Sequence, residues 1–244
     1  MGSAALLTGS ARPQLPLESS MKPPPQPYSL RDLYDQRFQP LERQQKNELW
    51  KVLCQSFFQK FVSNSDTVVD LGAGYCEFIN NIRCARKFAV DLNEETLNFA
   101  AEDVKVVLVP VSDLSAFEDG SIDVTFCSNL FEHLQTKEEL LAVLSEVCRI
   151  LRVNGRLLVL QPNIHYAYRE YWDYFDHYLP LSHLSLTEAL HLSGFSADLV
   201  RPRFLPYTFK SHLPKSPRLL RIYLRLPVLQ AFVGKQMFLV ASKR

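Results

Sequence analysis

Through the middle of the chain, short apolar runs alternate with stretches in which apolar residues recur every three or four positions. The runs predict β-strands, which we place at residues 67–71, 88–91, 104–109, 122–127 and 156–160. Between the last two, Leu140, Leu144 and Val147 share one face of a predicted helix over 137–151. Strands separated by helices in this way favour βαβ units, in which a parallel sheet is covered by helices on both faces.

The pattern changes toward both ends of the chain. Residues 1–27 hold six prolines among serine, glycine and glutamine, so we expect a disordered or extended leader there. Residues 29–62 return to helical spacing, as in Leu49, Leu53 and Phe57. Near the other end, residues 236–241 form a last apolar run and predict one more strand.

The composition is that of an ordinary globular protein, with 47% hydrophobic and 22% charged residues among 244 and a formal net charge of +1. No apolar run reaches the roughly 18 to 20 residues that a membrane-spanning helix needs. The five cysteines are scattered and never spaced Cys-x-x-Cys, which favours reduced thiols. We therefore expect a cytoplasmic protein, and the balanced charge argues against nucleic acid as a partner.

The balanced total hides two unlike parts. The last acidic residue is Asp198, and ten basic residues follow it. The first 198 residues hold 17 basic and 26 acidic ones, a balance of −9. If residues 215–226 are helical, Arg218, Arg221 and Arg225 form one stripe, which predicts peripheral contact with the inner membrane face or with a phosphate. The alternative is a helix that covers the sheet between its last two strands, with solvated arginines.

The clearest chemical pattern follows the first predicted strand. Gly72 and Gly74 come directly after Asp70, and glycine lets a backbone turn tightly and approach a ligand without a Cβ in the way. Asp91 ends the second predicted strand, where a carboxylate can accept hydrogen bonds from both hydroxyls of a ribose. This order of strand, glycine turn, helix, strand and acid indicates a site for an adenosine-containing ligand.

The charges around the turn narrow the choice of ligand. A dinucleotide-binding turn needs a third glycine where this chain has Glu77, whose carboxylate would repel a pyrophosphate. A dehydrogenase is therefore the least favoured enzyme class. Together with Asp70, Glu77 favours a cationic ligand, and S-adenosylmethionine carries both an ammonium and a sulfonium group.

From about residue 66 to residue 160, the chain resembles the class I S-adenosylmethionine-dependent methyltransferases. The segments similar to their motifs are 70–74, 90–93, 111–113, 119–134 and 151–157. One residue departs from the pattern, because Cys76 stands where many members have a third glycine, and we expect a slightly less open loop. More narrowly, residues 70–80 resemble a bacterial subgroup associated with glycan or polysaccharide biosynthesis.

The resemblance implies S-adenosylmethionine as cofactor and a Rossmann-like α/β fold, with a mostly parallel seven-stranded sheet and helices on both faces. It implies that Asp70 and Gly72 contact the methionine moiety of the cofactor and that Gly74 and Asp91 contact its ribose. Leu92, Ser112 and Asp113 would contact the adenine, and Asn129 the sulfonium. For Asp113, a capping or turn aspartate is the alternative.

The resemblance also divides the chain. We expect the leader over 1–27 and one methyltransferase domain over 28–244. Within the domain we expect an N-terminal helical lid (28–62), a cofactor-binding core (66–160), and an acceptor-side loop with the basic C-terminal part (161–244).

Methyl transfer from a sulfonium is an in-line displacement, so positioning the acceptor supplies much of the acceleration. A hydroxyl acceptor also needs a base, and histidine suits that role near neutral pH. The candidates are His133, after the fourth predicted strand, and His165 and His177, in the aromatic-rich segment 162–178. Alternatively, that segment only packs on the sheet, and His133 only caps or packs at a helix start.

Glu132 and His133 resemble part of the Glu-x-x-Glu-His metal site of some O-methyltransferases. The first position of that motif is Asn129 here, which leaves the site one acidic ligand short, so we expect no metal. The favoured function is methyl transfer to a small-molecule, saccharide or lipid-linked acceptor, at oxygen rather than nitrogen. The alternatives are a non-catalytic cofactor-binding or scaffold protein of the same fold, and an RNA methyltransferase that uses the basic C-terminal segment.

Overall fold

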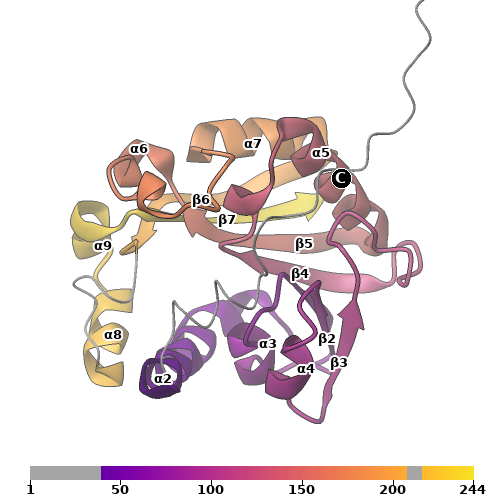
Figure 1. The fold of residues 1–244 in the computed structure, drawn as a ribbon, viewed down its shortest axis with the longest axis horizontal. Helices are drawn as coiled ribbons and strands as arrows, with labels where there is room; N and C mark the ends of the chain where they lie inside the picture. Colours follow the sequence, from indigo (N-terminus) through magenta and orange to yellow (C-terminus); the bar gives the residue numbers. More distant parts are fainter. Residues whose placement is uncertain (1–39, 208–215) are drawn as a thin grey trace, which may run out of the picture.

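The computed structural model describes residues 40–207 and 216–244, with side chains from residue 43 onward. The expected leader (1–27) and the first part of the expected lid therefore lie outside the described residues. Within the described parts, one seven-stranded sheet has the order β3-β2-β1-β4-β5-β7-β6 (Figure 1). This confirms the mostly parallel seven-stranded sheet that the sequence predicts.

Five strands of the sheet are parallel. They are β1 (Thr67–Leu71), β2 (Arg86–Asp91), β3 (Val104–Leu108), β4 (Ile122–Ser128) and β5 (Leu151–Pro162). β1 is buried along its whole length and lies between β2 and β4, which explains why its sequence is a continuous apolar run. The chain leaves β1 to one side and returns to β4 on the other, so the β1–β4 boundary is the point where ligands bind in such sheets.

β5 is longer than its prediction of 156–160. Its pairing with β4 shifts between Ile122 and Val124, which face Leu151 and Arg156. Residues 152–155, which precede the predicted strand, therefore form a bulge within β5. Asn154 in this bulge has a φ of 62°, a left-handed conformation that asparagine tolerates better than most residues.

The other two strands are antiparallel to β5. β7 (Gln236–Lys243) lies between β5 and the edge strand β6 (Phe195–Leu205). The last apolar run correctly predicted β7, whereas β6 has no counterpart among the predicted strands. β6 is mostly half-buried and contains Pro202, which an edge strand accepts because its outer backbone groups need no partner.

Helices cover both faces of the sheet (Figure 1). One hydrophobic core joins α2 (Pro40–Ser56), η1 (Phe58–Phe61), α3 (Glu77–Asn81) and α8 (Pro217–Leu224) to the sheet. The other joins α5 (Lys137–Ile150) and α7 (His183–Leu192) to the opposite face. α5 ends one residue before its prediction, and it is capped by Thr136, whose hydroxyl accepts a hydrogen bond from the backbone N–H of Glu139.

The remaining short elements are α4 (Thr96–Phe99), η2 (Phe131–His133), α6 (Ile164–Ala167), η3 (Tyr171–Asp173) and α9 (Pro227–Val233). His133 thus ends a single 3-10 turn rather than opening the long helix after β4. None of the helices within 40–207 and 216–244 combines the length and the hydropathy that crossing a bilayer requires.

Candidate active site

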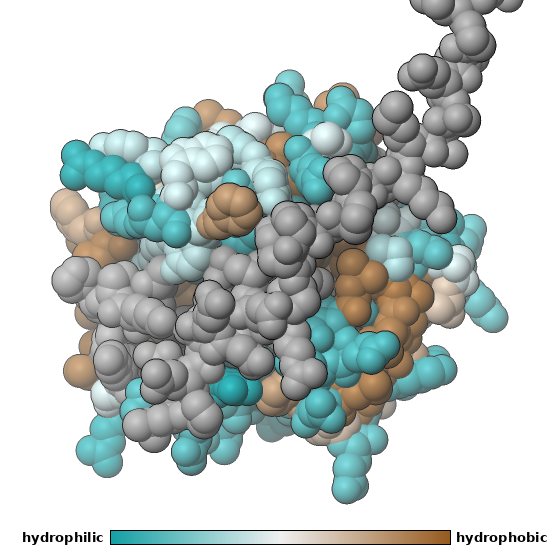
Figure 2. Space-filling view, viewed as in Figure 1, coloured by the Kyte–Doolittle hydropathy of each residue, from teal (hydrophilic) through white to brown (hydrophobic). Residues whose placement is uncertain are grey.

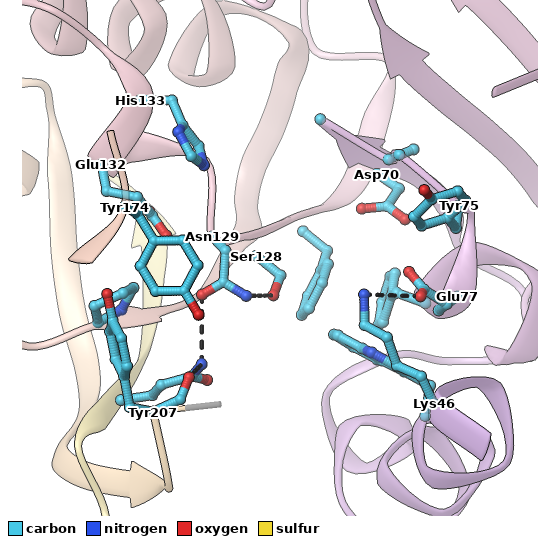
Figure 3. A pocket seen from close by; sticks show the side chains of 18 of the residues that line it. Lys46, Asp70, Tyr75, Glu77, Ser128, Asn129, Glu132, His133, Tyr174 and Tyr207 are labelled. Carbon is cyan, nitrogen blue, oxygen red and sulfur yellow. Dashed lines mark hydrogen bonds and ion pairs between the residues drawn. The ribbon is translucent and has the colours of Figure 1, made fainter. Parts of the chain in front are cut away.

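A cavity of about 240 Å³ opens at the carboxyl ends of β1 and β4. One wall, which we call the acidic wall, carries Asp70, Glu77 and the glycine loop between them. The opposite wall, called the histidine wall, carries Glu132, His133 and His177 with aromatic neighbours. Figure 3 shows Asp70, Glu77 and Lys46 on one side, Glu132 and Tyr174 on the other, and Asn129 between them.

The glycine loop has a backbone that side chains would disturb. Gly72 has a φ of 65°, and a Cβ at this position would lie 2.8 Å from Cδ1 of Leu130. Glycine is therefore favoured there by the backbone conformation, and a larger residue would also displace the end of the Leu130 side chain. Cys76, which precedes α3, has a φ of 58°, so the position where many relatives have glycine keeps a left-handed backbone here.

Asp91 ties β2 to the glycine loop. Its carboxylate accepts hydrogen bonds from the backbone N–H of Gly74 at 2.7 Å and of Asn93 at 2.8 Å. The carboxylate is therefore held at the tip of β2, next to the second glycine of the loop. Asp91 is buried and is not among the residues that line the cavity, and the ribose contact that the resemblance implies for it stays a prediction.

The residues expected around an adenine lie beyond the cavity. Leu92, Ser112 and Asp113 are exposed, and they are not among the residues that line the cavity. The Asp113 carboxylate accepts a hydrogen bond from the backbone of Ser115, and the Ser115 hydrogen bonds lower the pKa of Asp113. Asp113 thus has the turn geometry that we gave as its alternative, and Leu92 offers an apolar surface beside Asp91.

The acidic wall concentrates negative charge in a buried place. Burial raises the pKa of Asp70 well above its usual range, and the charges of Glu77 and Asp91 raise it further. Glu77 is partly balanced by Lys46 of α2, at 2.9 Å. A cationic ligand would favour the ionised form of Asp70 and offset the repulsion among the three carboxylates.

The histidine wall joins two distant segments of the chain. The backbone N–H groups of Tyr178 and Leu179 donate to the carbonyl of Glu132 at 2.8 and 3.2 Å, which places the aromatic-rich segment on η2. The rings of His133 and His177 are consequently 5.1 Å apart at their centres. Ligand atoms of Glu132, His133 and His177 all lie within 4.8 Å of one another.

Each of these three side chains has a different environment. Burial raises the pKa of Glu132 to about 7, and its Oε2 atom has no hydrogen-bond partner within the described residues. Burial lowers the pKa of His133, but Asp176, whose carboxylate is 3.2 Å from Nδ1, and Glu132 together raise it on balance. His177 is stacked on Tyr174, and its Nδ1 lies 3.4 Å from the hydroxyl of Tyr207.

His165 lies elsewhere. It is exposed on α6, its ring is next to that of His183, and it does not line the cavity. The structure therefore brings His133 and His177 together but not His165. Asn129, at the end of β4, does line the cavity and has a φ of 50°.

Some cavity residues were absent from the sequence-based candidates. Tyr207 follows β6, the strand that the pattern did not reveal, and Gln236 begins β7. The Gln236 side chain donates to the carbonyl of Tyr207 at 3.0 Å, which joins the two strand ends. Lys46 and Trp50 come from α2, where helical spacing showed an apolar face without showing what it faces.

The set of Glu132, His133 and His177 offers two imidazole nitrogens and one carboxylate oxygen. Such a donor set suits first-row transition metals as well as proton transfer. The buried, unpartnered Oε2 of Glu132 is compatible with either use.

Comparison with known protein families covers the central part of the chain and one part of the site. Residues 69–159 match the family model of a methyltransferase domain. The match begins in β1 and ends in β5, so it contains the glycine loop, Asp91 and η2. No curated protein matches the chain.

Solved structures extend the likeness to most of the chain. An S-adenosylmethionine-dependent methyltransferase from Archaeoglobus fulgidus is 21% identical and has a TM-score of 0.64, with 88% of this chain and 100% of that chain covered. One from Thermotoga maritima is 16% identical with a TM-score of 0.61, covering 87% and 99%. The fold is that of the class I methyltransferases.

A third structure with the class I methyltransferase fold contains ligands. It is geranyl diphosphate C-methyltransferase from Streptomyces coelicolor A3(2), in complex with Mg²⁺, geranyl diphosphate and S-adenosyl-L-homocysteine. It is 16% identical with a TM-score of 0.56, and the match covers 78% of this chain and 76% of that chain. The structural neighbours of the chain are thus S-adenosylmethionine-dependent enzymes, and the acidic wall matches the positive charges of that cofactor.

Proposed function

We propose that the chain transfers a methyl group from S-adenosylmethionine to an oxygen atom of a small-molecule, saccharide or lipid-linked acceptor. The observation that carries the proposal is the pairing of two walls across one cavity. The acidic wall suits a cationic cofactor, and the histidine wall suits an acceptor that must lose a proton. Asn129 lies between the walls, where methyl transfer would take place.

The cofactor would be held mainly by backbone and carboxylates. Asp91 would accept hydrogen bonds from the ribose, Gly72 and Gly74 would let the backbone approach, and Asp70 would face the methionine moiety. Leu92 would flank the adenine, with Ser112 and Asp113 at its edge. When bound, S-adenosylmethionine supplies an already activated methyl group.

On the histidine wall, His177 is the favoured proton acceptor. His133 is held by Asp176, and its raised pKa keeps it protonated to higher pH than an ordinary histidine. A protonated His133 stabilises an ionised Glu132 and leaves His177 to take the proton of the acceptor hydroxyl. The acceptor oxygen then bonds to the methyl carbon, while the electrons of the broken carbon–sulfur bond stay on sulfur.

Two resemblances and one charged segment bear on the class of acceptor. Residues 70–80 resemble a subgroup associated with glycan biosynthesis, and the Streptomyces coelicolor neighbour binds an isoprenoid diphosphate. That neighbour methylates carbon, so the choice of oxygen here depends on the histidine wall. The basic segment 215–226 supports an acceptor that carries phosphate or is attached to a lipid.

The decisive test measures release of S-adenosylhomocysteine from the purified chain with glycosides, polyprenyl-phosphate-linked saccharides and RNA as separate acceptors. We expect release with one of the first two. Cofactor binding without release on any acceptor would favour the scaffold alternative. Release on RNA alone, with salt-dependent binding, would favour the RNA methyltransferase.

Two variants test the histidine wall once an acceptor is found. His177→Ala should lower turnover by about 10² to 10⁴, the usual contribution of a general base, and leave cofactor affinity unchanged. The matched control is His165→Ala, which removes a histidine of the same segment outside the cavity and should keep full turnover. Equal turnover of both variants would remove His177 from the mechanism.

A chelator separates proton transfer from metal chemistry. If the histidine wall works without a metal, treatment with EDTA followed by gel filtration leaves turnover unchanged. Loss of turnover that a divalent cation restores would instead assign Glu132, His133 and His177 to a metal site.

A further inference from the structure

α9 has its polarity reversed relative to an ordinary surface helix. Val228 and Phe232 are 70% and 74% exposed, and Leu229 and Val233 are each 41% exposed. The buried side chain of this helix is polar: Gln230, which is 2% exposed. A soluble helix normally buries its apolar side chains and exposes its polar ones, so α9 presents to the outside what most helices bury.

Gln230 is buried for a structural reason. Its side-chain amide donates to the carbonyls of Tyr223 and Leu224 at 3.2 and 3.3 Å, which are among the last carbonyls of α8. Gln230 therefore fastens α9 to the end of α8. The face opposite Gln230 is thereby fixed outward, and that face is apolar.

α8 continues this exposed apolar surface and adds charge to it. Leu220 and Tyr223 pack into the core, whereas Leu219, Ile222 and Leu226 are exposed. α8 thus packs beside α2, with Leu220 and Tyr223 in the core that α2 shares with the sheet, and still leaves a second apolar stripe outside. Figure 2 shows hydrophobic side chains at the left edge of the molecule, where Figure 1 places α8 and α9.

The arginines lie beside this stripe. Arg218, Arg221 and Arg225 are exposed, and none has an ion pair within the described residues. By contrast, Lys235 pairs with Glu170, and Arg203 donates to the carbonyl of Gly234. The three arginines are therefore the cations that this surface offers to a partner.

The end of α9 lies near the cavity. α9 ends at Val233, three residues before Gln236, which lines the cavity and donates a hydrogen bond to the carbonyl of Tyr207. A partner seated on α9 would therefore lie near the Gln236 end of the cavity.

We propose that this surface docks on an anionic phospholipid bilayer, with the exposed apolar side chains of α8 and α9 in the interface and the three arginines at the headgroups. Exposed apolar side chains next to a row of three arginines fit a lipid surface better than a free phosphate, because a phosphate has no apolar part. Both helices are short, so we expect reversible attachment that strengthens with the anionic lipid content. The attachment would bring a lipid-linked acceptor to the cavity.

Co-sedimentation with vesicles tests the proposal. The purified chain is mixed with vesicles of phosphatidylcholine alone, or of phosphatidylcholine with phosphatidylglycerol, and we expect binding only to the second kind, weakened by salt. Replacing Arg218, Arg221 and Arg225 with Gln should lower vesicle affinity roughly a hundredfold, because each cation near an anionic surface contributes about fivefold. The charge control replaces the exposed Arg83, Arg86 and Lys105 with Gln and should bind as the unmodified chain does.

A second pair of variants tests the contribution of the exposed apolar side chains to vesicle binding. Val228→Ser with Phe232→Ser should abolish sedimentation, whereas Leu184→Ser with Leu192→Ser, two exposed leucines of α7, should not. Gel filtration and circular dichroism verify that each variant is folded and of unchanged size.

Three outcomes would overturn the proposal. They are equal binding by the arginine variant and its control, binding to neutral vesicles as strong as to anionic ones, and a concentration-dependent dimer of the unmodified chain that Phe232→Ser dissociates. The last result would assign the surface to a second copy of the chain. Vesicle binding requires neither cofactor nor acceptor, so failure here leaves the proposed methyl transfer standing.

Discussion

At the scale of single residues, the site depends on carboxyl groups held where ionisation is unfavourable. Asp70 and Glu132 lie on opposite walls of the cavity, and burial is the main cause that raises the pKa of each. Such groups destabilise the empty protein and are kept where a ligand or a neighbouring cation uses their charge. Removing the charge of such a carboxyl group should therefore raise the stability of the empty protein and weaken its function.

Asp70→Asn tests this on the acidic wall. The pKa of Asp70 is raised in the folded protein, so the stability that its protonated form gives is lost as the pH rises through this folded-state pKa. Asn has no proton to lose at this position. The variant should therefore raise the melting temperature of the empty protein near neutral pH. A gain of 1 kcal/mol corresponds to about 2 to 4 °C. Cofactor affinity should fall roughly 5- to 150-fold, because a charged hydrogen-bond partner is lost.

Differential scanning fluorimetry and calorimetry with S-adenosylhomocysteine measure the two effects of Asp70→Asn. Glu118→Gln, on the exposed turn before β4, is the control and should change neither. Unchanged affinity of the Asp70 variant would show that the acidic wall does not face the cofactor.

Glu132→Gln makes a pH-dependent prediction on the histidine wall. The pKa of Glu132 rises from 4.5 to about 7, so its protonated form stabilises the protein fully below about 4.5, and this stability is lost as the pH rises through 7. Between about pH 4.5 and pH 7, the free energy of unfolding of the variant should therefore rise relative to that of the unmodified protein by roughly 3 kcal/mol, at 1.36 kcal/mol per pKa unit. Urea unfolding at several pH values measures the difference, and a constant difference across that range would contradict a protonated Glu132.

At the scale of elements, the loop between β1 and α3 shows what local pattern reveals and what it hides. The glycines after a buried strand predicted the turn, and the structure confirms its backbone at Gly72. The departure from the family motif at Cys76 led us to expect a slightly less open loop, which stays a prediction, and the backbone at Cys76 has the left-handed conformation that glycine adopts more readily. A residue type restricts backbone conformation without determining it, because the surrounding packing can hold a strained conformation in place.

Gly72→Ala should disturb both stability and binding. The left-handed backbone costs an alanine about 1 to 2 kcal/mol, and the new Cβ also presses on Leu130 beside the cavity. Gly120→Ala is a close control, because Gly120 has the same φ of 65° but its Cβ would meet nothing nearer than 3.8 Å. Urea unfolding should show a loss of stability for both variants, at least as large for Gly72→Ala, whereas calorimetry should show weakened cofactor binding for Gly72→Ala alone. Equal cofactor affinities would place the loop away from the cofactor.

The predicted elements were those that the sheet buries most completely. β1 and β4 are apolar runs because both of their faces are covered, and such runs stand out in a sequence. β6 contains arginines and a proline because it is an edge strand, so its pattern resembles a loop. The sequence analysis considered a helix at residues 215–226 only as a condition, and α8 does begin at Pro217, but helical spacing cannot tell which of two apolar stripes faces the core.

At the scale of the whole molecule, the site combines segments that lie far apart in the sequence. His133 and His177 were separate candidates, and they meet only because the segment after β5 folds back on η2. The cofactor side was more predictable, since the glycine loop and Asp91 follow consecutive strands whose ends adjoin in any parallel sheet. The histidine wall depends on long-range packing, and a single sequence carries little information about such packing.

Cofactor binding should therefore stabilise mainly the residues around the cavity at the carboxyl ends of β1 and β4. At a concentration of S-adenosylhomocysteine about 100 times its dissociation constant, binding stabilises the protein by about 2.7 kcal/mol, which raises the melting temperature by about 5 to 11 °C. Backbone hydrogen exchange should slow at residues 72–77 and 128–133, which lie at the cavity. It should change little in α7, which packs near the edge strand β6. Uniform protection across the molecule, or no rise in melting temperature, would contradict the assigned cofactor site.

The position of β7 has a consequence for how the protein is made. β7 pairs with β5 on one side and β6 on the other, although it follows both in the chain. During synthesis, the ribosome therefore releases β5 and β6 before the strand that joins them. Until residues 236–243 emerge, the nascent chain carries an open apolar edge on β5, a surface that invites pairing with other chains and suits the binding of a chaperone.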